Sequence, residues 1–259
     1  NAFSEEEAQP FYVNAPFGIV LVHNGNLTNA RALKNEMFET DHRHINTESD
    51  SEVLLNVLAH ELARSSDGKS LKVQDVFAAV RQVHRRVRGS YAVIALIAGY
   101  GLLAFRDPFG IRPLCMGKGS DGSVTIASES VVLEGVGHAF ERNLHAGEAV
   151  FVELDGTIHS RQCSDNPSLN PCVFEYVYLA RPDSVMDGIS VYQARLGLGA
   201  ALAKRVASTI PPHQIDVVIP IPESSRPSAA QLAQLLGLAY REGFVKNRYV
   251  GRTFIMPGH

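Results

Sequence analysis

The sequence predicts two domains in tandem, an α+β domain followed by an α/β domain. Helical patterns occur up to residue 88, and short apolar runs separated by Gly, Pro and Asp follow them. Helices followed by antiparallel strands are typical of a layered α+β domain. Residues 164–171 are polar and carry two prolines, which indicates a linker, and strand and helix patterns alternate beyond them. We therefore expect one domain at residues 1–163 and a second at 164–259.

The first strand is predicted by an apolar run at residues 18–22, and we expect it to end at His23. Gly25 would then allow a tight turn into a helix capped by Thr28. The Asn24 amide beside the Gly25 N–H, at a strand end, can form an oxyanion hole, which stabilises the tetrahedral anion formed when a nucleophile attacks an amide carbonyl. An ordinary turn is the alternative, because Asn-Gly is a frequent turn dipeptide.

Two further amphipathic helices are predicted. Leucines recur every four residues after Ser49, and Ser49 and Glu52 have the spacing of a capping box. Asp50 lies in the first turn, where the helix macrodipole stabilises a carboxylate even in the absence of a ligand. A stripe of valines predicts the second helix at residues 71–88, which Gly89 would end.

Antiparallel strands are predicted after these helices. Four short apolar runs between residues 91 and 127 are separated by turn residues, and residues 149–159 have the pattern of a hairpin around Asp155-Gly156. Because these strands follow helices rather than alternating with them, they belong to the layered α+β domain.

The second domain contains two strand patterns and two helix patterns, at residues 173–179, 191–208, 216–222 and 228–236. Ser224 and Ser225 lie between the second strand and the second helix, and Pro227 suits the first position of that helix. Hydroxyls and backbone N–H groups at such a junction can bind phosphate. Plain helix capping is the alternative.

Residues 246–254 interleave three cations with two aromatic side chains, without helical or strand periodicity. Such a segment could close over a phosphorylated substrate and pair with its charges. A solvated charged loop is the alternative. A nucleic-acid surface is disfavoured because nothing else in the chain is basic enough.

Composition narrows the class of protein. The net charge is −3, which argues against nucleic acid or an anionic membrane as the main partner. No apolar run reaches the roughly 18 residues needed to cross a bilayer. Three cysteines are too few for a disulfide scaffold and indicate a reducing compartment. We therefore expect a cytoplasmic enzyme.

The first half resembles the class II glutamine amidotransferases. The resemblance rests on residues 21–29, on Asp50 at its helix start, and on two segments between strands, 106–113 and 127–130. It implies the αββα sandwich of the N-terminal-nucleophile hydrolases. It also implies that Asp50 holds the α-amino group of glutamine and that the two residues forming the oxyanion hole are Asn24 and Gly25.

The nucleophile of that family is an N-terminal cysteine, whose own α-amino group activates the thiol. Here residue 1 is Asn1, and Cys115, Cys163 and Cys172 are all internal. We therefore expect that the chain begins partway through its first domain.

The second half narrows the resemblance to the glutamine phosphoribosylpyrophosphate amidotransferases, or amidophosphoribosyltransferases. Three segments carry it, at residues 174–184, 220–225 and 246–254. This family forms 5-phosphoribosylamine from glutamine and phosphoribosyl pyrophosphate, the first committed step of purine nucleotide synthesis. The resemblance implies a phosphoribosyltransferase-type α/β domain, whose acidic diphosphate motif we expect after His259. The chain alone is then expected to be inactive.

The resemblance also implies site residues and partners. Ser224 would help to position Mg²⁺ and pyrophosphate, and Tyr249 with Ile255 would line an ammonia channel. A loop that folds over the sugar phosphate would contain Lys246, Arg248, Tyr249 and Arg252. The implied partners are glutamine, phosphoribosyl pyrophosphate, purine nucleotides as feedback inhibitors and further copies of the chain. Some family members carry an iron–sulfur cluster, and the sequence leaves its presence here open.

Two alternatives remain. Another class II amidotransferase, such as a glucosamine-phosphate or asparagine synthetase, would share the first half but not the Pro-Ile-Pro-Glu-Ser-Ser turn at 220–225. A non-catalytic sensor of a phosphoribosyl ligand would be favoured if the whole gene lacked the N-terminal cysteine.

Overall fold

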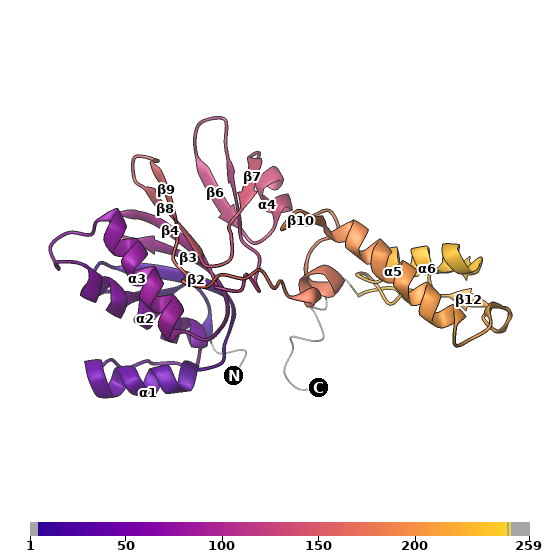
Figure 1. Ribbon diagram of the computed structural model, residues 1–259, viewed down its shortest axis with the longest axis horizontal. Helices are drawn as coiled ribbons and strands as arrows, with labels where there is room; N and C mark the ends of the chain where they lie inside the picture. Colours follow the sequence, from indigo (N-terminus) through magenta and orange to yellow (C-terminus); the bar gives the residue numbers. More distant parts are fainter. Residues whose placement is uncertain (1–4, 248, 250–259) are drawn as a thin grey trace. The chain divides into compact units, whose positions relative to one another are not determined.

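The computed structural model describes residues 5–247 and 249, which belong to two compact units (Figure 1). The first unit is Asn1–Pro171 and the second is Cys172–His259. The predicted linker belongs to the first unit, because the backbone N–H groups of Ser168 and Asn170 donate to the carbonyls of Pro108 and Phe109. The division therefore falls after Pro171, at the end of that segment rather than at its start.

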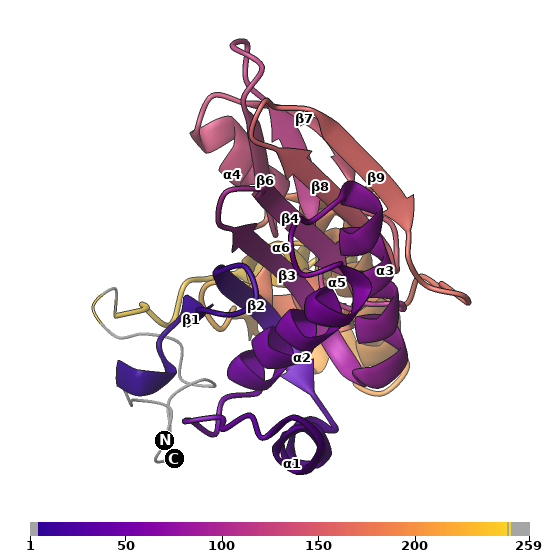
Figure 2. The same ribbon diagram turned by 90° about the vertical axis from the view of Figure 1, so that its left-hand side faces the viewer.

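A six-stranded antiparallel sheet forms the centre of the first unit, in the order β1-β2-β3-β4-β8-β9. These strands are β1 (Phe11–Val13), β2 (Ile19–Leu27), β3 (Gly89–Ile97), β4 (Gly101–Arg106), β8 (Glu148–Glu153) and β9 (Ile158–Gln162). A short 3₁₀ turn, Glu5–Glu7, precedes β1. Figures 1 and 2 show three helices on one face of this sheet, namely α1 (Ala30–Asp41), α2 (Asp50–Ser65) and α3 (Val73–Arg86).

A second, three-stranded sheet packs on the other face of the first one (Figure 2). Its strands, in spatial order, are β6 (Val124–Ala127), β5 (Cys115–Lys118) and β7 (Ala139–Asn143). The helix α4 (Ser130–Gly135) contacts all three of these strands. The layers are thus helix, sheet, sheet and helix, which is the αββα arrangement that the resemblance implies.

Side chains of the six-stranded sheet point alternately to its two faces, so each face contributes to a separate hydrophobic core. On β4, Leu103 and Phe105 point into the core beneath the helices, whereas Ala104 between them points into the core shared with the three-stranded sheet. The same alternation on β5 directs Met116 toward the shared core and Cys115 toward α4. Strands buried on both faces therefore appear in the sequence as continuous apolar runs.

The prediction that the first strand ends at His23 is wrong. Strand β2 continues to Leu27, because the segment from His23 to Leu27 pairs with residues 89–93 of β3. Asn24 and Gly25 are therefore strand residues and not a turn. The following helix is capped by Asn29 rather than Thr28, and the Asn29 side chain bonds the backbone at the end of α3 instead of its own helix.

The predicted capping box of α2 is formed only in part. Ser49 is the N-cap and its hydroxyl accepts a hydrogen bond from the Ser51 N–H. Glu52 does not return to Ser49. Its carboxylate instead accepts from the N–H groups of Asn46 and Thr47 and from the Thr47 hydroxyl. Glu52 thereby holds the loop that leads into the helix.

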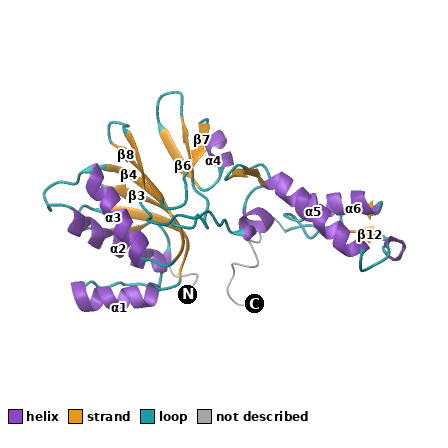
Figure 3. Cartoon of the chain, in the orientation of Figure 1, coloured by secondary structure: helices purple, strands orange, loops and turns teal. Residues whose placement is uncertain are grey.

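The second unit contains a helical pair and a small parallel sheet (Figure 3). Its elements are β10 (Val185–Met186), β11 (Ile189–Ser190), α5 (Val191–Ala207), the 3₁₀ turn Pro212–Gln214, β12 (Val217–Val218), α6 (Arg226–Leu236) and β13 (Ala239–Tyr240). Helices α5 and α6 pack closely at Gly199, where a Cβ would lie 2.4 Å from the Ser228 carbonyl oxygen. The two predicted helices are confirmed, and Gly237 ends α6 in the left-handed conformation.

The strand predicted at residues 173–179 is wrong. Glu175–Leu179 form a π-helical turn instead, closed by a hydrogen bond from the Ala180 N–H to the Glu175 carbonyl. Tyr176 anchors this turn in a small core with Met186 and Val191. A short apolar run cannot distinguish a strand from a buried helical turn by its period alone, so the sequence did not decide between them.

Candidate active site

The predicted oxyanion pair lies on β2 where that strand pairs with β3. Asn24 is opposite Ala92, and Gly25 is opposite Tyr91. The Asn24 side chain is exposed and makes no hydrogen bond to another residue in the described part of the chain. Its amide is thus available to a ligand on the open face of the strand.

Gly25 is required by a close backbone approach. A Cβ at this position would lie 2.0 Å from the Ser90 carbonyl oxygen and 2.6 Å from Nε2 of His23. No side chain fits there without moving β3. The glycine therefore serves strand pairing, and it leaves the backbone beside Asn24 bare for a substrate to approach.

Asp50 reaches the same strand from the start of α2. Its Oδ2 accepts a hydrogen bond from the Leu27 N–H at 2.7 Å. Its Oδ1 lies 3.9 Å from Nδ1 of His23, beyond hydrogen-bonding distance, and the side chain is partly exposed. The structure therefore brings Asp50 to the strand that carries Asn24 and Gly25, with one carboxylate oxygen left to receive an ammonium group.

His23 and Gln9 belong to this neighbourhood and were not predicted. The His23 side chain faces the helices, and its Nδ1 lies 3.0 Å from the Ser51 hydroxyl. The Gln9 carboxamide hydrogen-bonds both the N–H and the C=O of His23. Period-two alternation could have placed His23 on the buried face of β2. Gln9 offered no such signal, because it lies before the first strand.

The protonation of His23 is fixed by its surroundings. Burial lowers its pKa, and the negative charge of Asp50 opposes this shift only in part. The imidazole is therefore neutral at physiological pH, and its Nδ1 can either donate a hydrogen bond to the Ser51 hydroxyl or accept one from it, depending on the tautomer. It contributes shape and hydrogen bonds at this strand rather than a positive charge.

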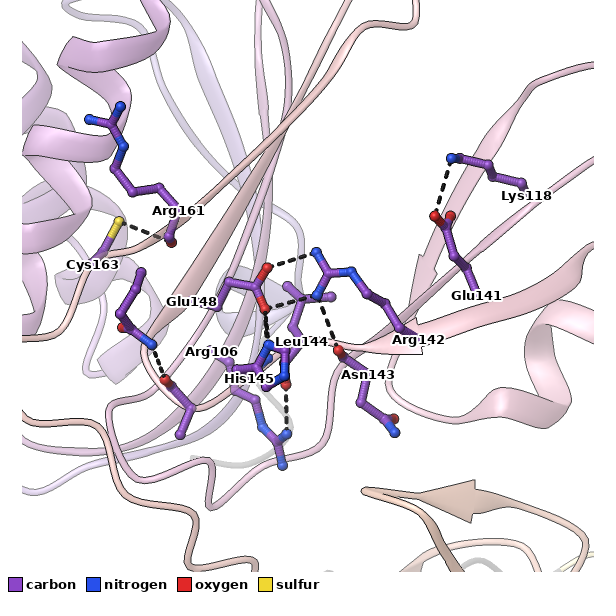
Figure 4. A network of polar contacts seen from close by, with 12 residues as sticks. Arg106, Lys118, Glu141, Arg142, Asn143, Leu144, His145, Glu148, Arg161 and Cys163 are labelled. Carbon is purple, nitrogen blue, oxygen red and sulfur yellow. Dashed lines mark hydrogen bonds and ion pairs between the residues drawn. The ribbon is translucent and has the colours of Figure 1, made fainter.

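The predicted segment 106–113 forms a buried polar junction, of which Figure 4 shows the contact between Arg106 and Leu144. The Arg106 guanidinium is buried and donates to the backbone carbonyls of Gly110, Arg112 and Leu144. The buried Asp107 carboxylate accepts from several backbone N–H groups, including that of Tyr91. Since Tyr91 pairs with Gly25, this junction supports the strand behind the oxyanion pair.

Two of the three cysteines are buried in the first unit, and the third belongs to the second unit. Cys115 is buried in β5, and Cys163 is buried at the end of the β9 hairpin. Burial raises the pKa of the Cys163 thiol to about 11, so the thiol stays protonated at neutral pH. Cys172 is half-buried in the second unit.

Residues predicted from the second half gather around one cavity of the second unit. This cavity has a volume of about 720 Å³, and Ser224 and Lys246 both line it. Three arginines line it as well, namely Arg181, Arg195 and Arg226. Arg181 pairs with Asp183, Arg226 lies 3.4 Å from Glu242, and Arg195 donates to backbone carbonyls. An anionic ligand such as a phosphorylated sugar would therefore compete with two carboxylates for the cations of this hollow.

Of the other predicted loop residues, the structure describes Tyr249. The Tyr249 side chain is 99% exposed, and its N–H donates to the Asn247 side chain. Arg248, Arg252 and Ile255 lie outside the described residues.

Within residues 5–247 and 249, no group of three or more His, Cys, Asp or Glu side chains is placed to hold a metal ion. The same residues contain no helix with the length and apolarity to span a membrane.

The fold and the site define a class of protein. A family model described as a glutamine amidotransferase domain matches residues 2–135, more than half of the 259 residues. The chain therefore belongs to the glutamine amidotransferase family. This assignment agrees with the helix, sheet, sheet and helix layers and with the approach of Asp50 to the Asn24 strand.

Individual relatives are similar across both units. The chain is 56% identical over 260 residues to the amidophosphoribosyltransferase of Haemophilus influenzae. It is 54% identical over 259 residues to that of Escherichia coli and 51% identical over 261 residues to that of Saccharomyces cerevisiae. Each match covers 98% of this chain and 51% of the relative, so the chain spans about half the length of these curated relatives.

Solved structures show the same likeness. The glutamine phosphoribosylpyrophosphate amidotransferase from B. subtilis, complexed with ADP and GMP, matches with a TM-score of 0.79 at 33% identity. A structure described as the allosteric regulatory enzyme of purine biosynthesis matches with a TM-score of 0.79 at 34% identity. These matches cover 98% of this chain and 52% and 51% of those chains, respectively.

Proposed function

We propose that the protein containing this chain is an amidophosphoribosyltransferase, which forms 5-phosphoribosylamine from glutamine and phosphoribosyl pyrophosphate in purine nucleotide synthesis. The observation that carries the proposal is the extent of the similarity. Relatives of that name match 98% of the chain at up to 56% identity, across both units and not only across the amidotransferase domain. A glucosamine-phosphate or asparagine synthetase would be expected to match the first unit alone.

In the first unit, glutamine would bind over β2. The Asp50 carboxylate would hold the α-amino group, since one oxygen is fixed by Leu27 and the other is free of hydrogen bonds to described residues. The Asn24 amide and the Gly25 N–H would stabilise the anion that forms at the glutamine carbonyl. The resemblance implies attack by an N-terminal cysteine, which releases ammonia through a thioester.

In the second unit, phosphoribosyl pyrophosphate would occupy the cavity lined by Ser224 and Lys246. Ammonia would attack C1 of the ribose and displace pyrophosphate. The loop containing Arg248, Tyr249 and Arg252 would close over the sugar phosphate, with Ile255 beside the path of ammonia. These loop roles rest on the resemblance of the sequence alone.

Mg²⁺ would accompany the diphosphate. The cavity offers it the Ser224 hydroxyl and the Glu223 carboxylate, which are oxygen ligands of the kind this ion prefers. Two such groups beside four cations do not form a complete cage. The residues therefore fit an ion that arrives with the substrate and is partly held by its phosphate oxygens.

The proposal includes a regulatory and cellular setting. Purine nucleotides would act as feedback inhibitors, in line with the ADP and GMP bound to the B. subtilis relative. We further infer a cytoplasmic homo-oligomer.

The decisive experiment supplies the intact protein with glutamine labelled in its amide nitrogen, phosphoribosyl pyrophosphate and Mg²⁺. We expect labelled phosphoribosylamine, with glutamate and pyrophosphate released in equal amounts, and loss of product when Mg²⁺ is chelated. A hexose phosphate, or aspartate with ATP, should not replace the phosphoribosyl substrate. Product with either of these acceptors would favour another amidotransferase, and tight ligand binding without turnover would favour a sensor.

A further inference from the structure

Gln9 completes the hydrogen bonding of β2 where its neighbouring strand stops. Strand β1 pairs with β2 only from Ile19 to Leu21, where Phe11 is the last partner. Beyond that point the Gln9 carboxamide replaces a strand. Its Oε1 accepts from the His23 N–H at 2.6 Å, and its Nε2 donates to the His23 carbonyl at 2.9 Å.

The same carboxamide connects β2 to the start of α2. Gln9 Nε2 also donates to the Ser51 hydroxyl at 3.2 Å, and that hydroxyl lies 3.0 Å from Nδ1 of His23. Gln9, Ser51 and His23 thus form a closed ring of hydrogen bonds, in which Gln9 bonds the backbone of His23 and Ser51 bonds its side chain. One member directly precedes Asn24 in the chain and another directly follows Asp50, so the ring is a chain neighbour of both predicted glutamine-binding groups.

This ring controls the position of the β2 backbone. An oxyanion hole acts only when its donors are held within a few tenths of an ångström of the developing charge. The segment carrying Asn24 and Gly25 is fixed by β3 on one edge and by Gln9 on the other. Gln9 is itself exposed, so apolar packing does not account for a glutamine here.

We propose that Gln9 is a positioning residue for glutamine hydrolysis, holding the strand of Asn24 and Gly25 against the helix of Asp50. The inference rests on the proposed glutaminase chemistry of the first unit. It assigns to Gln9 no contact with the substrate. Its effect is transmitted through the backbone of His23 and through Ser51.

The chain provides a matched control in Gln162. The Gln162 carboxamide also accepts from a backbone N–H, that of Ser164, and donates to a backbone carbonyl, that of Ala146. It is likewise exposed, but it lies at the end of β9. Gln162→Ala removes the same two kinds of hydrogen bond as Gln9→Ala without touching β2.

The experiment measures three activities of the intact protein, namely glutamate release, glutamine-dependent product formation and product formation with external ammonia. Gln9→Ala should lower kcat for both glutamine reactions about tenfold, a fraction of the 10²–10³-fold lost with an oxyanion donor. The ammonia reaction should stay within about twofold of wild type, because it bypasses the thioester. Gln9→Glu, of almost the same size, should lose at least as much, since it cannot donate to His23 or Ser51.

A double-mutant cycle separates positioning from general stability. In the Asn24→Ala background, Gln9→Ala should lower kcat by a smaller factor than in the wild-type background, since one of the two donors it positions is gone. Additive losses would overturn the inference. So would an equal loss of ammonia-dependent activity, or the same profile for Gln162→Ala. If the wild type releases glutamate but forms no phosphoribosylamine, the phosphoribosyl assignment fails, while the Gln9 comparison still stands on glutamate release.

Discussion

Asn24 and His23 are neighbours in the chain but point to opposite faces of β2, and this alternation separates their tasks. His23 is buried against α2, where Ser51 and Gln9 hold it. Asn24 is exposed, and in the described part of the chain its amide bonds no other residue. Because no described residue competes for the Asn24 amide, its N–H groups can donate to a transient anion.

Replacing that amide should impair glutamine chemistry alone. We expect Asn24→Ala in the intact protein to lower glutamine-dependent turnover by about 10²–10³, or roughly 2.7–4 kcal/mol of transition-state stabilisation. Turnover with external ammonia should persist, and steady-state kinetics with the two nitrogen donors measures both. An equal loss with both donors would show that Asn24 serves the fold and not the reaction.

His84 should make the stability of the first unit depend on pH. Burial lowers its pKa from an ordinary 6.5 to about 4. Between these values the unfolded chain binds a proton that the folded chain does not, so the free energy of unfolding falls as pH falls from about 6.5 to about 4. The free energy of unfolding decreases over this range by an amount on the order of 3 kcal/mol. The stability is fully present above pH 6.5, and the loss is complete below pH 4.

Denaturant titrations at several pH values between 4 and 7.5 measure this effect. His84→Gln should give a flatter dependence of unfolding free energy on pH in that window. His213→Gln provides a control, because His213 is exposed and belongs to the second unit. If His84→Gln and the wild type lose stability in parallel, the slope must come from other groups.

At the residue scale, the sequence suggested a candidate site but not what supports it. It suggested Asn24, Gly25 and Asp50 because an amide, a glycine and a carboxylate are functional types of residue, but it placed the first two in a turn, whereas they lie within β2. Gln9 could not be predicted, because its role depends on where β1 stops pairing, which is a property of the folded sheet. Its partner Ser51 lies 42 positions away in the chain.

At the scale of elements, one ion pair joins the two sheets of the first unit (Figure 4). Glu148 is buried at the start of β8, and its carboxylate receives two hydrogen bonds from Arg142 of β7. The His145 backbone N–H donates to the same carboxylate from the connecting turn. Burial raises the pKa of Glu148, but the hydrogen bonds from Arg142 and His145 and the Arg142 charge together outweigh it and lower the pKa overall.

This junction should be sensitive to acid. Since the folded pKa lies below the ordinary value, the pair stabilises the fold at pH above the ordinary glutamate range. That stability is lost as pH falls through the lowered pKa. Glu148→Gln should therefore reduce stability at neutral pH and flatten the acid limb of a melting-temperature profile. Glu39→Gln, at an exposed position of α1, leaves the junction intact and should keep that limb steep.

Helices and strands could be predicted where the apolar residues recur with one clear period. The helices at Val73–Arg86 and Val191–Ala207 follow clear apolar stripes and were predicted within a few residues. Strand β2 was predicted too short, because Asn-Gly favours a turn locally, whereas pairing with β3 keeps the chain extended. The π-helical turn at Glu175–Leu179 was missed because the pattern of apolar residues does not reveal its closing hydrogen bond, from the Ala180 N–H to the Glu175 carbonyl.

At the scale of the whole molecule, the proposed function needs chemistry in both units. Ammonia formed over β2 in the first unit would be consumed at the cationic cavity of the second. Ammonia released when no phosphoribosyl substrate is bound would be wasted. An enzyme of this kind should therefore use glutamine slowly until the second unit is occupied, which is a coupling free energy between two sites.

The segment beginning at Lys246 is the candidate for this coupling. Lys246 lines the cavity, and Tyr249 is almost fully exposed, so closure on an anion would bring both toward the ligand. We expect phosphoribosyl pyrophosphate with Mg²⁺ to stimulate glutamate release by the intact protein and to protect Lys246, Arg248 and Arg252 from limited trypsin digestion. Pyrophosphate with Mg²⁺ is the control for charge alone, and it should protect less because it lacks the sugar phosphate.

The variant Tyr249→Ala tests whether closure and stimulation are one event. It should weaken the stimulation of glutamate release more than it weakens binding of phosphoribosyl pyrophosphate, because the exposed ring contributes to the closed state and not to the cavity of the open one. Binding is measured by calorimetry and stimulation by glutamate release at saturating ligand. Equal digestion with and without saturating ligand, together with normal stimulation in Tyr249→Ala, would show that this segment is a charged surface loop and that the coupling runs elsewhere.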